Sequence, residues 1–185
     1  LQCVMVAIHT PYGVVLYAND CKFDDHPLIG QKPNYKRLKQ LNGNVKVIIL
    51  ESLYAHKEGK TPSEKVAKEM LKDVMLGIKN TGNAIFVTTF ASHIARLKSI
   101  LEFGRKLNRK VVFLGRSMAK YINAAEKLDL IKFSKSSEIF PFRNQINKQL
   151  QKIEQDRGKY LVICTGSQGE PGSILDKIVK KQLSF

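Results

Sequence analysis

The chain has 185 residues, of which 43% are hydrophobic, and its formal net charge at pH 7 is +15. This length suits about one to one and a half domains with a real core, and no apolar stretch reaches the roughly 18 residues that span a bilayer. The 31 lysines and arginines against 16 acidic residues favour a nucleic acid, a membrane surface or an acidic protein as partner. A lysine-rich, solvated surface would give the same balance.

Two features of the sequence concern the compartment. The first six residues contain no basic segment and no cleavage-site pattern, so we expect no signal peptide. The three cysteines, Cys3, Cys21 and Cys164, form no paired spacing and lie in apolar or strand-like contexts. This usage is typical of a reduced, cytoplasmic protein.

The first fifty residues predict strands joined by turns. Apolar segments at 3–8 and 14–18 flank Thr-Pro-Tyr-Gly at 10–13, which is the turn chemistry of a hairpin. Residues 34–41 predict a short helix. The run Val-Lys-Val-Ile-Ile-Leu at 45–50 predicts a further, buried strand that ends at an acidic residue.

From residue 61 onward, strand and helix patterns alternate. Thr61 can cap a helix in which Pro62 takes the first position and Glu64 completes a capping box. Its apolar residues recur at helical spacing, namely Val66, Met70, Leu71, Val74 and Ile78. The later predicted strands are 84–87, 111–114 and 160–164, and the later helices are 92–107, 117–127, 144–155 and 173–181. The helix at 144–155 lies within a mixed, basic segment at 130–158. This alternation predicts an α/β fold with a mainly parallel sheet flanked by helices.

Each of the three later strands stops abruptly at a small, polar loop. The loops are residues 88–93, 115–117 and 165–170. The carboxyl ends of parallel strands share one crevice, where backbone N–H groups and helix N-termini favour an anion. With a charge of +15, the anion we expect is a phosphate of a polyanion.

The third loop, Thr-Gly-Ser-Gln-Gly-Glu-Pro, is the most specific of the three. Gly166 and Gly169 with the small side chains around them would let a ligand approach the backbone of Ser167 and Gln168. The loop matches neither a Walker phosphate loop nor a dinucleotide-binding fingerprint. A tight strand-to-helix turn with no ligand is the alternative.

The first two loops place basic and hydroxyl side chains at predicted helix starts. Arg96 and Arg116 could fork onto a phosphate, and His93 could donate a hydrogen bond to one. Ser92 and Ser117 stand at plausible N-cap positions, and capping is the alternative role of both. For His93 the alternative is a buried, satisfied histidine.

Two carboxylates follow strands in the first third of the chain. Asp20 lies at a strand end, before a loop that carries Asp24, Asp25 and His26, and a carboxylate there can bridge two divalent metals. Glu51 also projects from a strand end and could orient a metal ligand. Capping of turns is the alternative for Asp20, and a cap or a surface acid is the alternative for Glu51.

Taken together, these segments resemble the ribonuclease J family, in which a metallo-β-lactamase domain carries a β-CASP insertion. The resemblance is carried by residues 19–24, 49–52 with 61–64, 87–97, 115–118 and 165–171, in this order along the whole chain. The Glu-Ser pair at 51–52 looks more like archaeal members of the family and the related cleavage-factor nucleases than like typical bacterial members.

The resemblance implies a ribonuclease that uses two zinc ions to hydrolyse phosphodiesters of single-stranded RNA, 5′-to-3′, with a preference for a 5′-monophosphate. It implies that Asp20 bridges the two zinc ions, that Glu51 is an acid near the metal, and that the later strand-end loops form the RNA crevice. Residues 1–51 would be the end of the metallo-β-lactamase half and 52–185 most of the β-CASP domain. The complete protein would be a cytoplasmic homodimer with no membrane partner.

The departures from the family pattern concern the metal. The His-x-His-x-Asp-His motif is absent, and His9, His26, His56 and His93 do not fit the family's histidine positions. A dizinc site needs several imidazoles besides a bridging carboxylate. We therefore expect a middle piece of a longer enzyme, inactive by itself and without retained zinc. The alternative is a non-catalytic α/β module that binds a nucleotide or nucleic acid through the same loops.

Overall fold

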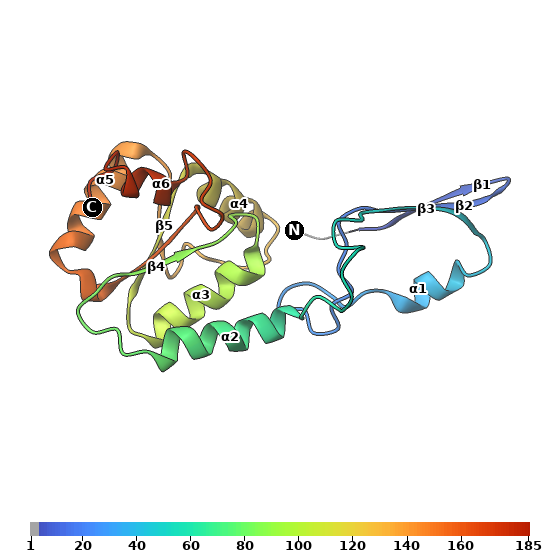
Figure 1. The fold of residues 1–185 in the computed structure, drawn as a ribbon, viewed down its shortest axis with the longest axis horizontal. Helices are drawn as coiled ribbons and strands as arrows, with labels where there is room; N and C mark the ends of the chain where they lie inside the picture. Colours follow the sequence, from blue (N-terminus) through green and yellow to red (C-terminus); the bar gives the residue numbers. More distant parts are fainter. Residues whose placement is uncertain (1–3) are drawn as a thin grey trace. The chain divides into compact units, whose positions relative to one another are not determined.

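The computed structural model describes residues 4–185, so the predicted start of the first strand at Cys3 lies outside the described residues. The chain divides into two compact units, Leu1–Ala67 and Lys68–Phe185, and each has its own sheet (Figure 1). Within the described range, no helix is long and apolar enough to cross a membrane.

The first unit is built on a sheet of three strands and carries one short helix. The elements are β1 (Val6–Thr10), β2 (Gly13–Ala18), α1 (Tyr35–Gln40) and β3 (Val45–Leu50). β1 and β2 form the predicted antiparallel hairpin, and β3 pairs with β2 in parallel. At the hairpin turn Gly13 has a φ of 126°, and a Cβ there would lie 2.9 Å from the carbonyl oxygen of Asn44, so only glycine suits this position.

The prediction that the strand at 45–50 is buried is wrong for the described chain. Val47, Ile48, Ile49 and Leu50 are 49–57% exposed. Continuous apolar runs are typical of strands covered on both faces, but β3 is one of the two edge strands of its sheet and most of its apolar surface lies open among the described residues.

Helix α2 (Glu64–Gly77) begins later than the predicted Thr61 cap. The hydroxyl of Ser63 accepts the N–H of Val66 at 3.3 Å, and the carboxylate of Asp24, forty positions earlier, accepts the N–H of Glu64 at 2.8 Å. Burial raises the pKa of the Asp24 carboxyl, but the hydrogen bonds from the backbone of Glu64 and His26 outweigh it and the pKa is lowered. A distant carboxylate, which local spacing does not show, therefore helps to set the start of this helix.

The apolar stripe of α2 does not face a core in the described structure. Val66, Met70, Val74 and Ile78 are 48–63% exposed, whereas Met75, outside the predicted stripe, is 4% exposed. The helix is confirmed, but its spacing did not identify the side that packs.

The second unit contains a sheet of four parallel strands. These are β4 (Ile85–Thr88), β5 (Lys110–Leu114), β6 (Glu138–Phe140) and β7 (Tyr160–Cys164), in the order β4-β7-β5-β6. All three neighbouring pairs are parallel, which confirms the predicted α/β fold. The sequence interpretation missed β6 because it has three residues and is followed at once by a proline.

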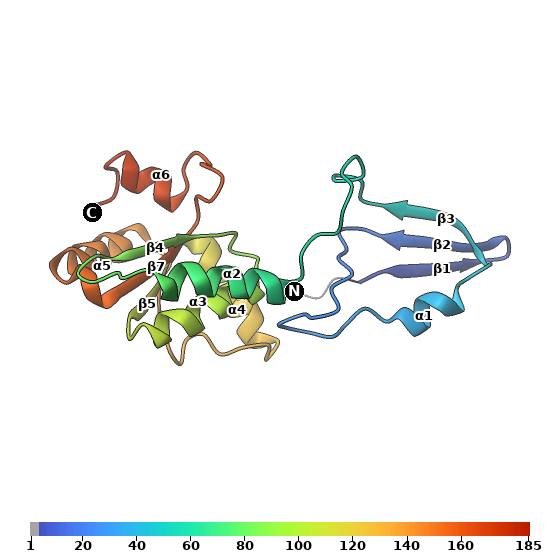
Figure 2. The ribbon, with the colours of Figure 1, turned by 60° about the horizontal axis from the view of Figure 1, so that its bottom comes forward.

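Helices cover both faces of this sheet, as Figure 2 shows. They are α3 (Ile94–Lys106), α4 (Arg116–Lys127), α5 (Arg143–Gln155) and α6 (Ile174–Val179), with a 3-10 turn at Arg157–Lys159. One sheet face packs against α5 and α6 through Val112, Leu114, Val162 and Cys164. The alternate residues of β5 and β7 point to the other face, where α3 comes so close that a Cβ on Gly104 would lie 2.6 Å from Val111.

Cys164 lies at the carboxyl end of β7 but is part of this core. Its side chain is fully buried, and burial raises the pKa of its thiol to about 12. It therefore remains a neutral, packed thiol at physiological pH and is excluded as a nucleophile.

Candidate functional site

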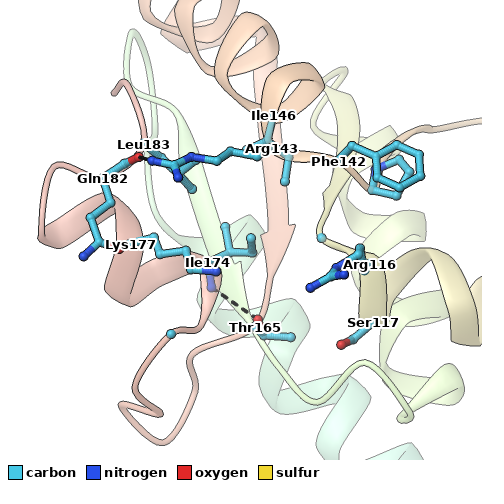
Figure 3. A pocket seen from close by; sticks show the side chains of 13 residues that line it. Arg116, Ser117, Phe142, Arg143, Ile146, Thr165, Ile174, Lys177, Gln182 and Leu183 are labelled. Atoms are coloured by element: carbon cyan, nitrogen blue, oxygen red, sulfur yellow. Dashed lines mark hydrogen bonds between the residues drawn. The ribbon is translucent and has the colours of Figure 1, made fainter.

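A cavity of about 470 Å³ lies at the carboxyl ends of β5, β6 and β7 (Figure 3). The residues that line it come from the segments directly after these strands, from α5, from α6 and from the segments that flank α6. They are Gly115, Arg116, Ser117, Pro141, Phe142, Arg143, Ile146, Thr165, Gly172, Ile174, Lys177, Gln182 and Leu183. The predicted crevice at the strand ends thus exists for β5 and β7, and the missed strand β6 contributes to it.

The charged groups on the cavity wall are all positive. Arg116, Arg143 and Lys177 come from three different helices, and none of the described residues that line the cavity is Asp or Glu. Arg143 donates a hydrogen bond to the carbonyl oxygen of Gln182 at 2.9 Å, which holds its guanidinium across the cavity. The nearby carboxylate of Asp176 does not line the cavity and accepts the N–H of Gly172 at 2.8 Å. Cations that converge on a concave surface concentrate a positive potential there, and an anion is the complementary ligand.

Two helices begin at this cavity without a side-chain cap. The N-cap of α4 is Gly115 and the N-cap of α5 is Phe142, neither of which has a polar side chain. The alternative role of Ser117 as the N-cap of α4 is therefore excluded. Ser117 lies inside the helix, and in Figure 3 its hydroxyl and the guanidinium of Arg116 point from the start of α4 toward Thr165 and Ile174.

The loop at 165–170 contributes Thr165 to the cavity, but its two glycines and the residues between them do not line it. Gly166 has a φ of 127°, and a Cβ there would lie 2.6 Å from Cβ of Leu175, so its glycine is required by packing. The N–H of Gln168 donates to the carboxylate of Glu170 at 3.1 Å, and the N–H of Gly169 donates to Gly166. These donors are already used inside the loop, whereas the side chains of Ser167 and Gln168 are exposed.

Ser92, His93 and Arg96 lie at the start of α3, after β4, and do not line the cavity. The alternative role of Ser92 as a cap is excluded here too, because His93 and not Ser92 is the N-cap residue. His93 is exposed, so the alternative of a buried histidine is excluded, while Arg96 is partly buried and has an interaction partner.

Asp20 and Glu51 both lie in the first unit and are exposed. The carboxylate of Glu51 accepts the N–H of Leu53 at 2.5 Å, a local contact of an exposed acid. The neighbouring Asp25 accepts a hydrogen bond from the hydroxyl of Tyr35 at 2.8 Å and lies 3.6 Å from the Lys60 ammonium.

The described residues do not fit a two-zinc centre by themselves. Among residues 4–185 there is no group of three or more His, Cys, Asp or Glu side chains placed to hold a metal ion. A tetrahedral zinc site takes three or four such ligands, so Asp20 can supply at most one ligand of a site that needs others.

The comparison with known protein families identifies the family to which most of the second unit is similar. Residues 82–184 match the family model described as ribonuclease J, β-CASP domain. The chain belongs to the ribonuclease J family. All residues that line the cavity lie inside this β-CASP match.

Curated relatives extend the likeness across both units. The protein named Ribonuclease J of Pyrococcus abyssi is 46% identical over 183 residues, which is 98% of this chain and 40% of that protein. Ribonuclease J of Methanocaldococcus jannaschii is 39% identical over 98% of the chain and 41% of its own length. Ribonuclease J of Thermus thermophilus is 32% identical over 94% of the chain and 28% of its own length. The chain thus spans about two fifths of the two more similar relatives, whose sources agree with the predicted archaeal likeness.

The structure adds β-CASP residues that the sequence interpretation did not select. The cavity is also lined by Phe142, Arg143 and Lys177. The first two could have been predicted from the alternation of strands and helices along the sequence. A parallel sheet needs a strand between the helices at 117–127 and 144–155, and the residues after that strand necessarily lie at the same edge as the other loops.

Proposed function

We propose that this chain is part of a ribonuclease and that its β-CASP cavity binds phosphate groups of single-stranded RNA. The observation that carries the proposal is the concave wall with Arg116, Arg143 and Lys177 and no acidic side chain among its described residues. Membership of the ribonuclease J family and the net charge of +15 support RNA as the polyanion. The three cations lie on separate helices, so they can contact successive phosphates of an extended strand.

The finer proposals follow from the family. In the complete protein, the cavity would hold RNA that enters with a 5′-monophosphate and is degraded 5′-to-3′ in the cytoplasm. Zinc would supply the activated water in that protein, and Asp20 would be one of its ligands, with Glu51 nearby. Residues 1–51 would belong to the metallo-β-lactamase half and 52–185 to the β-CASP domain of a homodimer.

The second candidate is a non-catalytic module that binds RNA or a nucleotide. It is favoured by the lack of any group of three or more potential metal ligands within residues 4–185. For the chain by itself, both candidates predict binding without cleavage. They differ in the complete protein, where only the first predicts zinc-dependent hydrolysis of RNA.

The salt dependence of RNA binding tests the role of Arg116. The affinity of the chain for a single-stranded RNA is measured over a series of salt concentrations, with the Arg116→Gln variant alongside. Each phosphate contact contributes about 0.7 to the slope of log affinity against log salt for single strands, so the variant is expected to lose about 0.7 of slope.

The matched control is Arg105→Gln. Arg105 is exposed in the last turn of α3 and does not line the cavity, so the same change of charge should leave the slope nearly unchanged. Equal slopes for Arg116→Gln and the unmodified chain would contradict a phosphate contact at Arg116 and refute this part of the proposal.

A further inference from the structure

An aromatic side chain, that of Phe142, lies at the edge of the cationic cavity, and its ring neither caps a helix nor packs in the core. Phe142 is 60% exposed, although it occupies the N-cap position of α5. Caps are normally Ser, Thr, Asp or Asn, because their side chains accept the free N–H groups of the helix. Here the backbone N–H of Phe142 donates to Oε1 of Gln145 at 3.4 Å, while the ring neither caps the helix nor enters the core.

The sheet register places the backbone of Phe142 beside that of Arg116. In the parallel pair of β5 and β6, Leu114 lies opposite Phe140, and the pairing continues with a hydrogen bond of 2.9 Å from the N–H of Gly115 to Phe140. Arg116 and Phe142 each lie two residues beyond the end of their strand. Because β5 and β6 are adjacent, and adjacent strands are about 4.8 Å apart in a sheet, the two residues follow neighbouring strand ends. Figure 3 shows both on the same side of the cavity, with Arg143 extending to the opposite side.

We propose that this end of the cavity is a nucleotide subsite in which the base stacks on Phe142 and the phosphate lies against Arg116 and Ser117. The inference rests on the proposed binding of RNA and specifies its form: the ligand is a nucleotide with an unpaired, accessible base. In a duplex the bases are stacked on one another and their faces are not available to a protein ring.

The size and lining of the cavity favour a nucleotide over a bare phosphate ion. Its volume of about 470 Å³ lies in the range of roughly 300–1,000 Å³ typical of sites for organic ligands. Phe142, which is 60% exposed, and the half-buried Pro141 add apolar surface to the cationic wall, which a base or ribose can cover and an inorganic ion cannot. Stacking on an aromatic ring is tolerant of base identity, so the subsite would accept each of the four nucleotides.

Tryptophan fluorescence provides a direct test, because the chain contains no tryptophan. The Phe142→Trp variant of the full 185-residue chain carries a single indole at the subsite. Titration with uridine 5′-monophosphate is expected to quench its emission, because the base stacks on the indole. Ribose 5-phosphate, which has the same phosphate but no base, is expected to bind with little quenching.

Tyr12→Trp is the matched control, because Tyr12 is 88% exposed at the β1–β2 turn of the first unit. Its emission should not respond to either ligand. In a second measurement by calorimetry, Phe142→Ala should weaken uridine 5′-monophosphate binding about tenfold and leave ribose 5-phosphate binding unchanged.

Equal quenching by both ligands, or equal loss of both affinities in Phe142→Ala, would overturn the stacking subsite. If the subsite fails but RNA binding still depends on salt through Arg116, the proposed function stands without it. If the chain binds neither RNA nor uridine 5′-monophosphate, the proposed function fails as well.

Discussion

Replacing Arg116, Arg143 and Lys177 together by glutamine is expected to weaken the binding of single-stranded RNA by about a hundredfold at low salt, or roughly 3 kcal/mol. These are the cations of the cavity wall, and a glutamine keeps much of each side chain's length while it removes the charge. The salt slope should fall by about 2, since each lost phosphate contact removes about 0.7. Filter binding or fluorescence anisotropy over a salt series measures both quantities.

The matched control removes the same charge from the opposite edge of the sheet. Arg105, Lys127 and Lys152 lie in the last turns of α3, α4 and α5, and none of them lines the cavity. Their combined replacement by glutamine should reduce affinity only slightly, through the general loss of charge. If both triple variants lose the same affinity, the binding depends on overall charge and the cavity has no special role.

Replacing Arg109 by methionine is expected to destabilise the second unit by about 3 kcal/mol. Arg109 directly precedes β5, and the residue is only 8% exposed. Its guanidinium donates to the carbonyl oxygens of Asn83 at 2.6 Å and Tyr160 at 3.0 Å, and also to that of Asn80. Burial lowers the pKa of Arg109 from its high ordinary value. One side chain therefore ties together the segment before β4 and the first residue of β7.

Without the guanidinium, these carbonyl groups would lose their donor while they remain partly buried, which costs more than the loss of an exposed hydrogen bond. The stability of Arg109→Lys should lie between those of the unmodified chain and Arg109→Met, because a single ammonium cannot replace a planar fork that serves three acceptors. Arg105→Met, an exposed arginine nearby in sequence, should change stability by no more than about 0.5 kcal/mol. Urea unfolding followed by far-ultraviolet circular dichroism measures the differences, and equal effects of Arg109→Met and Arg105→Met would contradict the assignment.

The regular elements of the second unit could be predicted because its strands are short, continuous apolar runs. Val111–Leu114 and Leu161–Cys164 are almost completely buried, with helices on both faces, and this environment selects the residues that the pattern detects. The order of elements then predicted parallel strands whose loops share an edge. The apolar run of β6 is too short for the pattern to detect. Because this strand was missed, Phe142 and Arg143, which follow it, were not included in the predicted site.

Other features escaped prediction because their partners are distant in sequence. The start of α2 depends partly on the carboxylate of Asp24, and the local signal at Thr61 misplaced it. Gly166 looked like a residue that gives a ligand room, whereas the space above it is filled by Leu175. In β3 and α2 the hydrophobic pattern identified the element, but the burial of its side chains depends on what packs against it, which no local pattern contains.

The most direct test of the account is a residue-by-residue titration of the chain with uridine 5′-monophosphate by nuclear magnetic resonance. If the β-CASP cavity binds the nucleotide, the amide signals of Gly115, Ser117, Arg143 and Lys177 should shift together with one dissociation constant, and Arg116→Gln should weaken that constant. Shifts confined to the exposed Ser167–Gly169 turn or to the start of α3, with no change at the cavity residues, would contradict it.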